Sequence, residues 1–213
     1  MTMLKRVEFT CVNCAGPFDG DAMVSQTTFS GQASDFRPLY DDLLATRMHS
    51  CPACGFAGYE SVFWEQEQVP SEVSRQIAEH LTPTAATIRP SAPRRYEAAA
   101  RIAEWSGAPD FLVGDLYLKA SWCCEAQLEV DADDDEASFR RKAIARFERA
   151  LATGDLDPGN AAALTYLVGE LYRRIGETAT AHTWFDRTIA LTDGDPDFAE
   201  LAERQKSDPS NEM

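Results

Sequence analysis

The sequence lacks long apolar runs. No stretch approaches the roughly 18 apolar residues that a membrane span needs, although hydrophobic residues make up 44% of the 213-residue chain and charged residues 26%. That balance is typical of a folded globular protein. The opening "MTMLKRVEFTC" also has no apolar segment of the roughly 7 to 15 residues found in signal peptides. We therefore expect no membrane association and a cytoplasmic protein, whose thiols stay reduced.

Recognisable catalytic motifs are missing as well. The chain contains no glycine-rich phosphate loop, no GxSxG elbow and no HExxH pair, the patterns that position phosphates, nucleophilic serines and catalytic zinc. The acidic stretch that begins at Asp193 starts like a calcium loop, but Phe198 replaces its glycine and Arg204 its bidentate glutamate. The sequence therefore predicts a protein without enzymatic activity.

Basic residues are scarce, and only four of them are lysines. Lysine and arginine together number 20 against 35 acidic residues, which gives a net charge of −15. Residues 1–64 alone carry four basic and seven acidic side chains. Affinity for nucleic acid depends largely on basic side chains that neutralise phosphates, so a nucleic-acid partner is disfavoured. We interpret the acidity as a solvated surface.

Four of the six cysteines form two C-x-x-C pairs, Cys11 with Cys14 and Cys51 with Cys54. Such a turn directs two thiolates at one ion, and the glycine after Cys54 lets the chain fold back. The 36 residues between the pairs exceed the commonest ribbon spacing of roughly 15 to 20 residues, but only the turns touch the metal. We predict one structural Zn²⁺ held by all four thiolates, a closed site with no position left for catalysis.

Other interpretations of these cysteines stay open. Iron is the main competing metal. A thiol–disulfide centre needs an exposed thiolate of low pKa, usually at a helix N-terminus in an alternating strand and helix pattern, and neither pair has that context. Simple unligated thiols are the remaining alternative.

The other cysteines and the histidines are predicted to be structural. Cys123 and Cys124 are adjacent in a helical segment, where neighbouring side chains point about 100 degrees apart, so both are interpreted as small core residues. His49 is expected on a strand surface, because four thiolates already complete the metal site. His80 and His182 are expected on helix surfaces.

The pattern of apolar residues divides the chain and predicts an α+β protein. Period-two alternation in "RVEF", "MVSQTTF" and "LLATRMH" indicates strands, while Val73, Ile77 and Leu81 indicate a helix over 71–81 with Ser71 as its N-cap. The proline-rich stretch "PTAATIRPSAPRR" at 83–95 is interpreted as a linker. The predicted parts are a zinc-ribbon-like β domain (1–69), a bridging helix and linker (70–93), an all-α tetratricopeptide-like domain (94–206) and a flexible tail (207–213).

A repeat is visible within the helical part. The stretch "FLVGDLY" at 111–117 matches "YLVGELY" at 166–172, and "AIARFERAL" at 143–151 matches "AHTWFDRTI" at 181–189. Helical spacing also predicts helices over 94–106 and from Val113 to about residue 130. The repeat therefore indicates two related helix pairs.

The second helix pair is similar to a tetratricopeptide unit over residues 160–191. Gly169, Tyr172, Ala181 and Phe185 match its small and aromatic packing positions. Small residues let paired helices approach closely, and aromatic ones fill the groove between neighbours. Two units are fewer than the roughly three that usually stand alone. Neighbouring helices, or a second copy in a homo-oligomer, are expected to complete the packing.

The knuckles, "DFRPLY" at 35–40, "CPACGFAGY" and "GDLYLKASW" together resemble a family known as domain of unknown function 2225. The resemblance covers about residues 4–151. Members are similar to zinc-ribbon heads followed by helical, often tetratricopeptide-like, tails, without an established activity. The resemblance implies metal ligation at the four cysteines and structural roles for Asp35, Pro38 and Tyr40.

The sequence favours a non-enzymatic scaffold or adaptor, in which zinc stabilises the head and a groove of the helical repeat binds a protein or peptide. A nucleic-acid-binding ribbon is the alternative, because such ribbons often serve that purpose, although the charge opposes it. A C-x-x-C redox protein is a third hypothesis.

Overall fold

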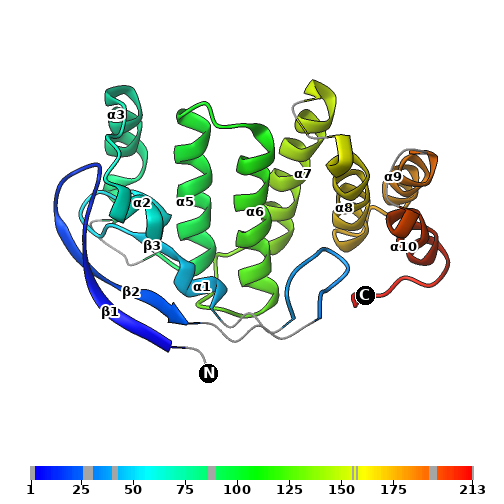
Figure 1. The fold of residues 1–213 in the computed structure, drawn as a ribbon, viewed down its shortest axis with the longest axis horizontal. Coiled ribbons are helices and arrows are strands. Elements are labelled where there is room, and N and C mark those ends of the chain that lie inside the picture. Colours follow the sequence, from blue (N-terminus) through cyan, green and yellow to red (C-terminus); the bar gives the residue numbers. More distant parts are fainter. Residues whose placement is uncertain are drawn as a thin grey trace.

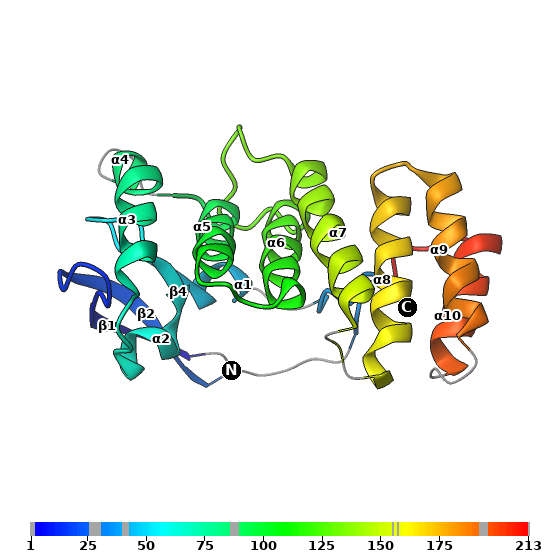
Figure 2. The same cartoon turned by 90° about the horizontal axis from the view of Figure 1, so that it is seen from above.

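The computed structural model describes residues 3–25, 31–39, 43–85, 90–154, 156, 158–191 and 196–212. The fold is α+β, as predicted. Short strands form a head at one end, and helices stand side by side in a row that extends from it (Figure 1). Seen from above, α9 and α10 close the opposite end of the row (Figure 2). Within the described residues, no helix has the length and apolarity to cross a membrane.

The head contains two antiparallel strand pairs, and each pair is joined by a C-x-x-C turn. Strands β1 (Met3–Thr10) and β2 (Pro17–Ser25) form the first pair, and β3 (Met48–Ser50) and β4 (Ala57–Tyr59) form the second. The strand predicted over 6–9 is confirmed. Only the first part of the strand predicted over 23–29 lies in β2, and residues 26–29 fall outside the described residues.

The prediction of a strand over 43–49 is wrong for most of its length. Residues Leu44–Arg47 form the one-turn helix α1, and only then does β3 begin. The helical turn is stabilised from the body: the Tyr96 hydroxyl donates to the Leu44 carbonyl at 2.9 Å, and Arg95 donates to the Ala45 carbonyl at 2.7 Å. These donors satisfy carbonyls that a helix end leaves without partners.

Three short helices follow β4 and cover the head. They are α2 (Glu60–Glu65), α3 (Ser71–His80) and α4 (Thr82–Ala85). The predicted apolar face of α3 is confirmed, because Val73, Ile77 and Leu81 are buried against the head. The predicted cap is wrong: Pro70 holds the N-cap position, and no side chain caps the helix.

Helix α5 (Ala92–Trp105) begins inside the segment that the sequence assigns to the linker. Proline is well tolerated in a first helical turn because its missing N–H would have no helical partner there. The Ser91 side chain caps the turn by accepting from the Arg94 amide at 3.4 Å. The helix ends where predicted, with Gly107 following at a φ of +71°.

Five more helices complete the row. They are α6 (Asp110–Glu125), α7 (Glu136–Thr153), α8 (Ala161–Arg174), α9 (Thr178–Ala190) and α10 (Pro196–Ser207), with a 3₁₀ turn at Pro158–Asn160 before α8. Helix α6 is shorter than predicted, since it ends at Glu125 and not near residue 130. Gln127 and Glu129 then take positive φ values, which a helix cannot continue through.

The two halves of the sequence repeat occupy equivalent places. Gly114 of α6 lies against the Phe147 ring of α7, and Gly169 of α8 lies against the Phe185 ring of α9. A Cβ atom would approach Phe147 to 2.5 Å and Phe185 to 2.8 Å, closer than real Cβ contacts. Both phenylalanines are buried. The small residues therefore set the spacing of each helix pair, as the sequence predicts.

Replacing Gly114 with alanine is expected to destabilise the fold by about 1 to 3 kcal/mol. Alanine favours helix by up to about 1 kcal/mol, but its methyl group has no room beside the Phe147 ring. Urea denaturation measures the difference. Gly159→Ala is the matched control, because a Cβ atom there meets nothing within 4 Å. Equal stability of the two variants would contradict a spacing role for Gly114.

Part of the head packs into the main hydrophobic core of the helical row. Leu44, Met48 and Ala57 of the head are buried in the same cluster as Tyr96 of α5 and Val113 of α6. The row is extended at its far end by α10, whose buried Ala202 joins Phe185 and Tyr166 in a smaller cluster. The repeat units are therefore flanked by helices of the same chain.

Candidate metal centre and buried ion cluster

The two C-x-x-C turns bring four sulfur atoms together. The Sγ atoms of Cys11 and Cys54 are 3.6 Å apart and those of Cys14 and Cys51 are 3.7 Å apart. All four lie within 4.8 Å of one another. A disulfide needs sulfurs about 2.0 Å apart, and all six cysteines of the chain are free. The four cysteines, which we call the cysteine cluster, are close enough to bind one metal ion.

The backbone of the two turns is nearly the same. In the first, the Cys11 amide donates to the Gly16 carbonyl and the Ala15 amide donates to the Cys11 carbonyl, both at 2.9 Å; the second repeats this pair of bonds from Cys51 and Gly55 at 2.8 Å. Both turns need a positive φ directly after the second cysteine, and Ala15 adopts 57° where glycine would be easier. Two chemically different sequences thus converge on one turn shape.

The sulfur geometry fits a tetrahedral metal site. With metal–sulfur bonds of about 2.3 Å, the edges of a sulfur tetrahedron measure about 3.8 Å. The two closest sulfur pairs, at 3.6 and 3.7 Å, are close to that edge. Four thiolate donors suit zinc or an iron centre. Such a centre has all four positions filled by protein, so it would hold the chain in place and leave no site for a substrate.

Most of the cysteine cluster is buried. Cys11, Cys51 and Cys54 are buried, and Cys14 is exposed. On the α3 and α4 side, the Thr82 hydroxyl donates to the Cys54 carbonyl at 2.9 Å, and a Cβ atom on Gly55 would lie only 2.9 Å from the Leu81 Cβ. Helices α3 and α4 and the residue between them therefore pack directly against the second turn.

The thiols of Cys11, Cys51 and Cys54 titrate together. Hydrogen bonds from Cys11 and Cys54 lower the pKa of the Cys51 thiol, while hydrogen bonding to Cys51 and Cys54, followed by burial, raises the pKa of Cys11. Sulfurs in such contact cannot all ionise unless a cation compensates their charge. The protein alone therefore does not favour four thiolates, and a divalent ion would.

The remaining cysteines match their predictions. Cys123 and Cys124 of α6 are buried in the main core, and burial, with the nearby Asp134 and Glu136, raises the pKa of Cys124 to about 12. His80 and His182 are exposed, as predicted.

The prediction for His49 is wrong. Its side chain is only 8% exposed and packs on Phe9, with ring centroids 4.8 Å apart. Burial lowers its pKa. The Phe9 ring of β1 and the Phe63 ring of α2 both lie against the imidazole, so the side chain is enclosed and does not face solvent.

A second cluster of polar side chains joins the loop of residues 31–39 to α6 and α8, and sequence reasoning did not find it as a cluster. Arg174 donates to Glu125 at 2.9 Å and to Glu170 at 2.7 Å, and its guanidinium lies 3.5 Å from Asp35. The Ser34 hydroxyl donates to Glu170 at 2.6 Å. Asp35, Ser34 and Glu170 are fully buried. We call this group the buried ion cluster; its charged members are Asp35, Glu125, Glu170, Arg37, Arg140, Arg173 and Arg174.

The structural role that the family resemblance implies for Asp35 agrees with this geometry, since Trp122 also donates to its carboxylate at 3.0 Å. Pro38 pairs with Gln32 in an isolated β-bridge within the same loop. Tyr40 lies outside the described residues.

A signal for part of this cluster was present in the repeat. The offset of 55 residues aligns the ion pair Glu170 and Arg174 with Asp115 and Lys119, and both pairs are spaced four residues apart. Each pair contacts a residue from the N-terminal part of the chain: Arg174 approaches Asp35 of the 31–39 loop, and Lys119 donates to the Tyr59 hydroxyl of the head at 3.1 Å. The repeat therefore carries a charged anchor as well as its packing residues.

One of the comparisons with known proteins identifies a family that covers most of the chain. A family model described as an uncharacterised protein conserved in bacteria (DUF2225) matches residues 4–208. This match extends beyond the residues on which the sequence resemblance was based, into the second helix pair and α10. No curated protein and no solved structure matches the sequence.

Proposed function

The chain belongs to the bacterial DUF2225 family of uncharacterised proteins, and on its geometry we propose that it is a non-enzymatic, zinc-stabilised protein-interaction module. The observation that carries the proposal is an open apolar groove on the α7 and α9 side of the helical row. The proposal has three parts: a structural metal ion, a side of the helical row that the chain itself covers, and an open groove that a partner can enter.

The metal is Zn²⁺, one per chain, bound by Cys11, Cys14, Cys51 and Cys54. Support comes from the sulfur spacings of 3.6 and 3.7 Å and from the all-thiolate donor set. Because the four sulfurs fill the tetrahedron, the metal fastens the head and performs no reaction. A cytoplasmic location accords with six free thiols.

One side of the helical row is covered by the chain itself. Residues 31–39, the blue loop beside α6 and α8 in Figure 1, contact α6, α8 and α10. Phe36 of this loop lies against Tyr166 and Phe198, with ring centroids 5.7 and 5.9 Å apart. The tail adds to the cover, since the Ser34 amide donates to the Asn211 carbonyl. A partner that used this side would have to displace both segments.

The other side offers an open groove of about 670 Å³ between α7 and α9. Leu151, Trp184 and Leu191 supply its apolar lining, and Leu191 is 40% exposed. The Arg187 guanidinium stacks on the Trp184 ring at 4.4 Å. Exposed apolar surface beside an aromatic anchor is typical of interaction sites. We assign this groove to a segment of a partner protein that presents apolar side chains.

Affinity capture from a bacterial lysate tests the assignment. Trp184→Asp combined with Leu191→Asp is expected to abolish recovery of the specific partner while the helical content is retained. The control is Leu112→Asp, because Leu112 is 50% exposed but does not line the groove. Recovery of the same proteins by the double variant and the unaltered chain would refute the groove as the binding site.

A further inference from the structure

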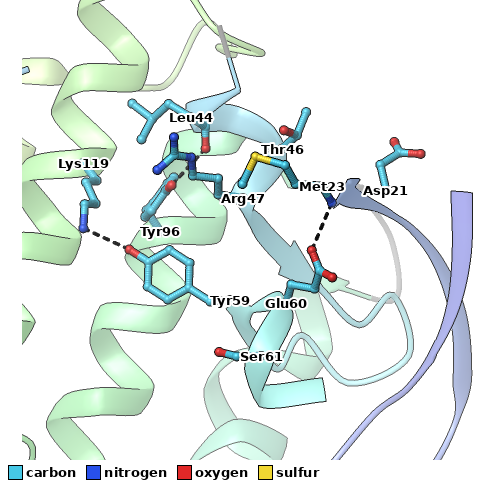
Figure 3. Close-up of a pocket in the computed structure, with 10 residues that line it drawn as sticks. All are labelled: Asp21, Met23, Leu44, Thr46, Arg47, Tyr59, Glu60, Ser61, Tyr96 and Lys119. Atoms are coloured by element: carbon cyan, nitrogen blue, oxygen red, sulfur yellow. Dashed lines mark hydrogen bonds between the residues drawn. The ribbon is translucent and has the colours of Figure 1, made fainter. Parts of the chain in front are cut away.

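A cavity of about 320 Å³ lies where the head meets α5 and α6 (Figure 3). Its volume is at the lower end of the range of about 300–1,000 Å³ that is usual for small-molecule sites. The lining is mixed: Met23, Leu44 and the rings of Tyr59 and Tyr96 provide apolar surface, and four charged side chains and two hydroxyl side chains provide the rest. The cavity does not overlap the groove between α7 and α9, so it is independent of the proposed function.

Hydrogen-bond donors gather on one side of the cavity. Lys119 and Arg47 lie toward α6 in Figure 3, and both positive charges act on Tyr59. The Tyr59 hydroxyl accepts from the Lys119 ammonium at 3.1 Å, which leaves its own proton to donate. Burial raises the pKa of Tyr59, although Lys119 and Arg47 oppose the shift. The phenol therefore stays protonated and can donate to an anionic oxygen.

Carboxylates lie on the other side. Glu60 at the start of α2 accepts from the Met23 amide at 3.1 Å, and Asp21 on β2 lines the same wall. Figure 3 shows these two residues away from α6, with Tyr59 and Arg47 between them and Lys119. Opposite charges at two ends of a small cavity complement a ligand that carries both signs. A long polyanion such as nucleic acid would meet repulsion at the acidic end.

The second repeat unit offers a comparison for this position. Lys119 corresponds to Arg174 at the offset of 55 residues, and Arg174 faces a carboxylate from the chain itself, that of Asp35 at 3.5 Å. In the first unit the equivalent cation, Lys119, is paired with Asp115 as Arg174 is with Glu170. Its second side faces the cavity beside Tyr59 and has no carboxylate in the place of Asp35 among the cavity-lining residues. We propose that this cavity binds a small zwitterion, a free amino acid, with its carboxylate at Lys119, Tyr59 and Arg47 and its ammonium group at Glu60 and Asp21.

Calorimetry of the full-length, zinc-loaded protein with free amino acids at millimolar concentration tests the proposal. At least one is expected to bind, and its N-acetyl and methyl-ester derivatives, which lack one charge each, to bind roughly 10- to 100-fold more weakly. Tyr59→Phe and Glu60→Gln should each weaken the binding of the free amino acid by a similar factor. Thermal melts of each variant confirm that the fold persists.

The matched control is Asp19→Asn, which removes a carboxylate from the same strand two residues before Asp21 and outside the cavity lining. It is expected to leave the affinity unchanged. Absence of binding by every amino acid would overturn the proposal. Equal affinity for the N-acetyl derivative would also overturn it, because the acidic end would then contribute nothing. Tight binding only by peptides would show that the cavity recognises a chain end and would equally refute the free amino acid.

Discussion

Replacing Cys51 by serine is expected to abolish stoichiometric zinc binding and to unfold the head. Structural zinc sites contribute roughly 10–16 kcal/mol of binding free energy, which equals or exceeds the roughly 5–15 kcal/mol that holds a typical domain together. The head has little else at this end: its core around the cysteine cluster consists mainly of Phe9, Phe18, Phe56 and Phe63, joined by α3. Elemental analysis and near-ultraviolet circular dichroism measure the two losses.

Cys123→Ala is the matched control for this experiment. Cys123 is as buried as Cys51 but lies within α6 and away from the cysteine cluster, so the variant should retain one zinc per chain. A strong chelator should reproduce the effect of Cys51→Ser in the unaltered protein and make four thiols reactive. Metal-free protein with a fully folded head would rule out the structural role. Iron in place of zinc, found by the same elemental analysis, would correct the identity of the metal alone.

Features that repeat at short spacing were predictable from the sequence. Each C-x-x-C turn fixes its own local geometry. The four cysteines therefore form one cluster as soon as the two turns face each other. The pairing of Gly114 with Phe147 and of Gly169 with Phe185 follows from the repeat, because a glycine and an aromatic ring recur at matching helix positions. Such patterns can be recognised in the sequence without knowledge of the tertiary structure.

Features that depend on distant contacts were not predictable. The residues 43–49 alternate like a strand, yet Tyr96 and Arg95 of α5 bind the carbonyls of a helical turn there. Ser34 and Glu170 are 136 residues apart in the sequence, and nothing local to either marks the contact. His49 carries an ordinary polar side chain, and only the hairpin packed over it makes it buried. Tertiary contacts decide each of these cases.

Replacing Arg174 by methionine is expected to destabilise the protein by about 3–5 kcal/mol, the usual cost of removing one partner from a buried ion pair. Burial raises the pKa of Asp35, and Arg174 is the main charge opposing that shift. Burial also opposes ionisation of Glu125, but Arg174, Arg37 and Arg140 outweigh it and lower its pKa. Without Arg174, the buried Asp35 carboxylate would lose the main positive charge that offsets its burial. Urea denaturation measures the loss.

The same substitution should release the segment that covers α6 and α8. Arg174 also donates to the Ser34 hydroxyl at 3.0 Å and to the Asn211 carbonyl at 3.3 Å, so one guanidinium holds the loop and the tail together. Hydrogen exchange at the Ser34 amide should therefore accelerate. Arg149→Met is the control: that side chain is 54% exposed and pairs with Asp110, and such surface pairs contribute at most about 1 kcal/mol. Equal losses of stability in the two variants would contradict this role, because Arg174 would then contribute no more than an exposed ion pair. The loop of residues 31–39 would in that case be held on α6 and α8 by the aromatic contacts of Phe36 alone.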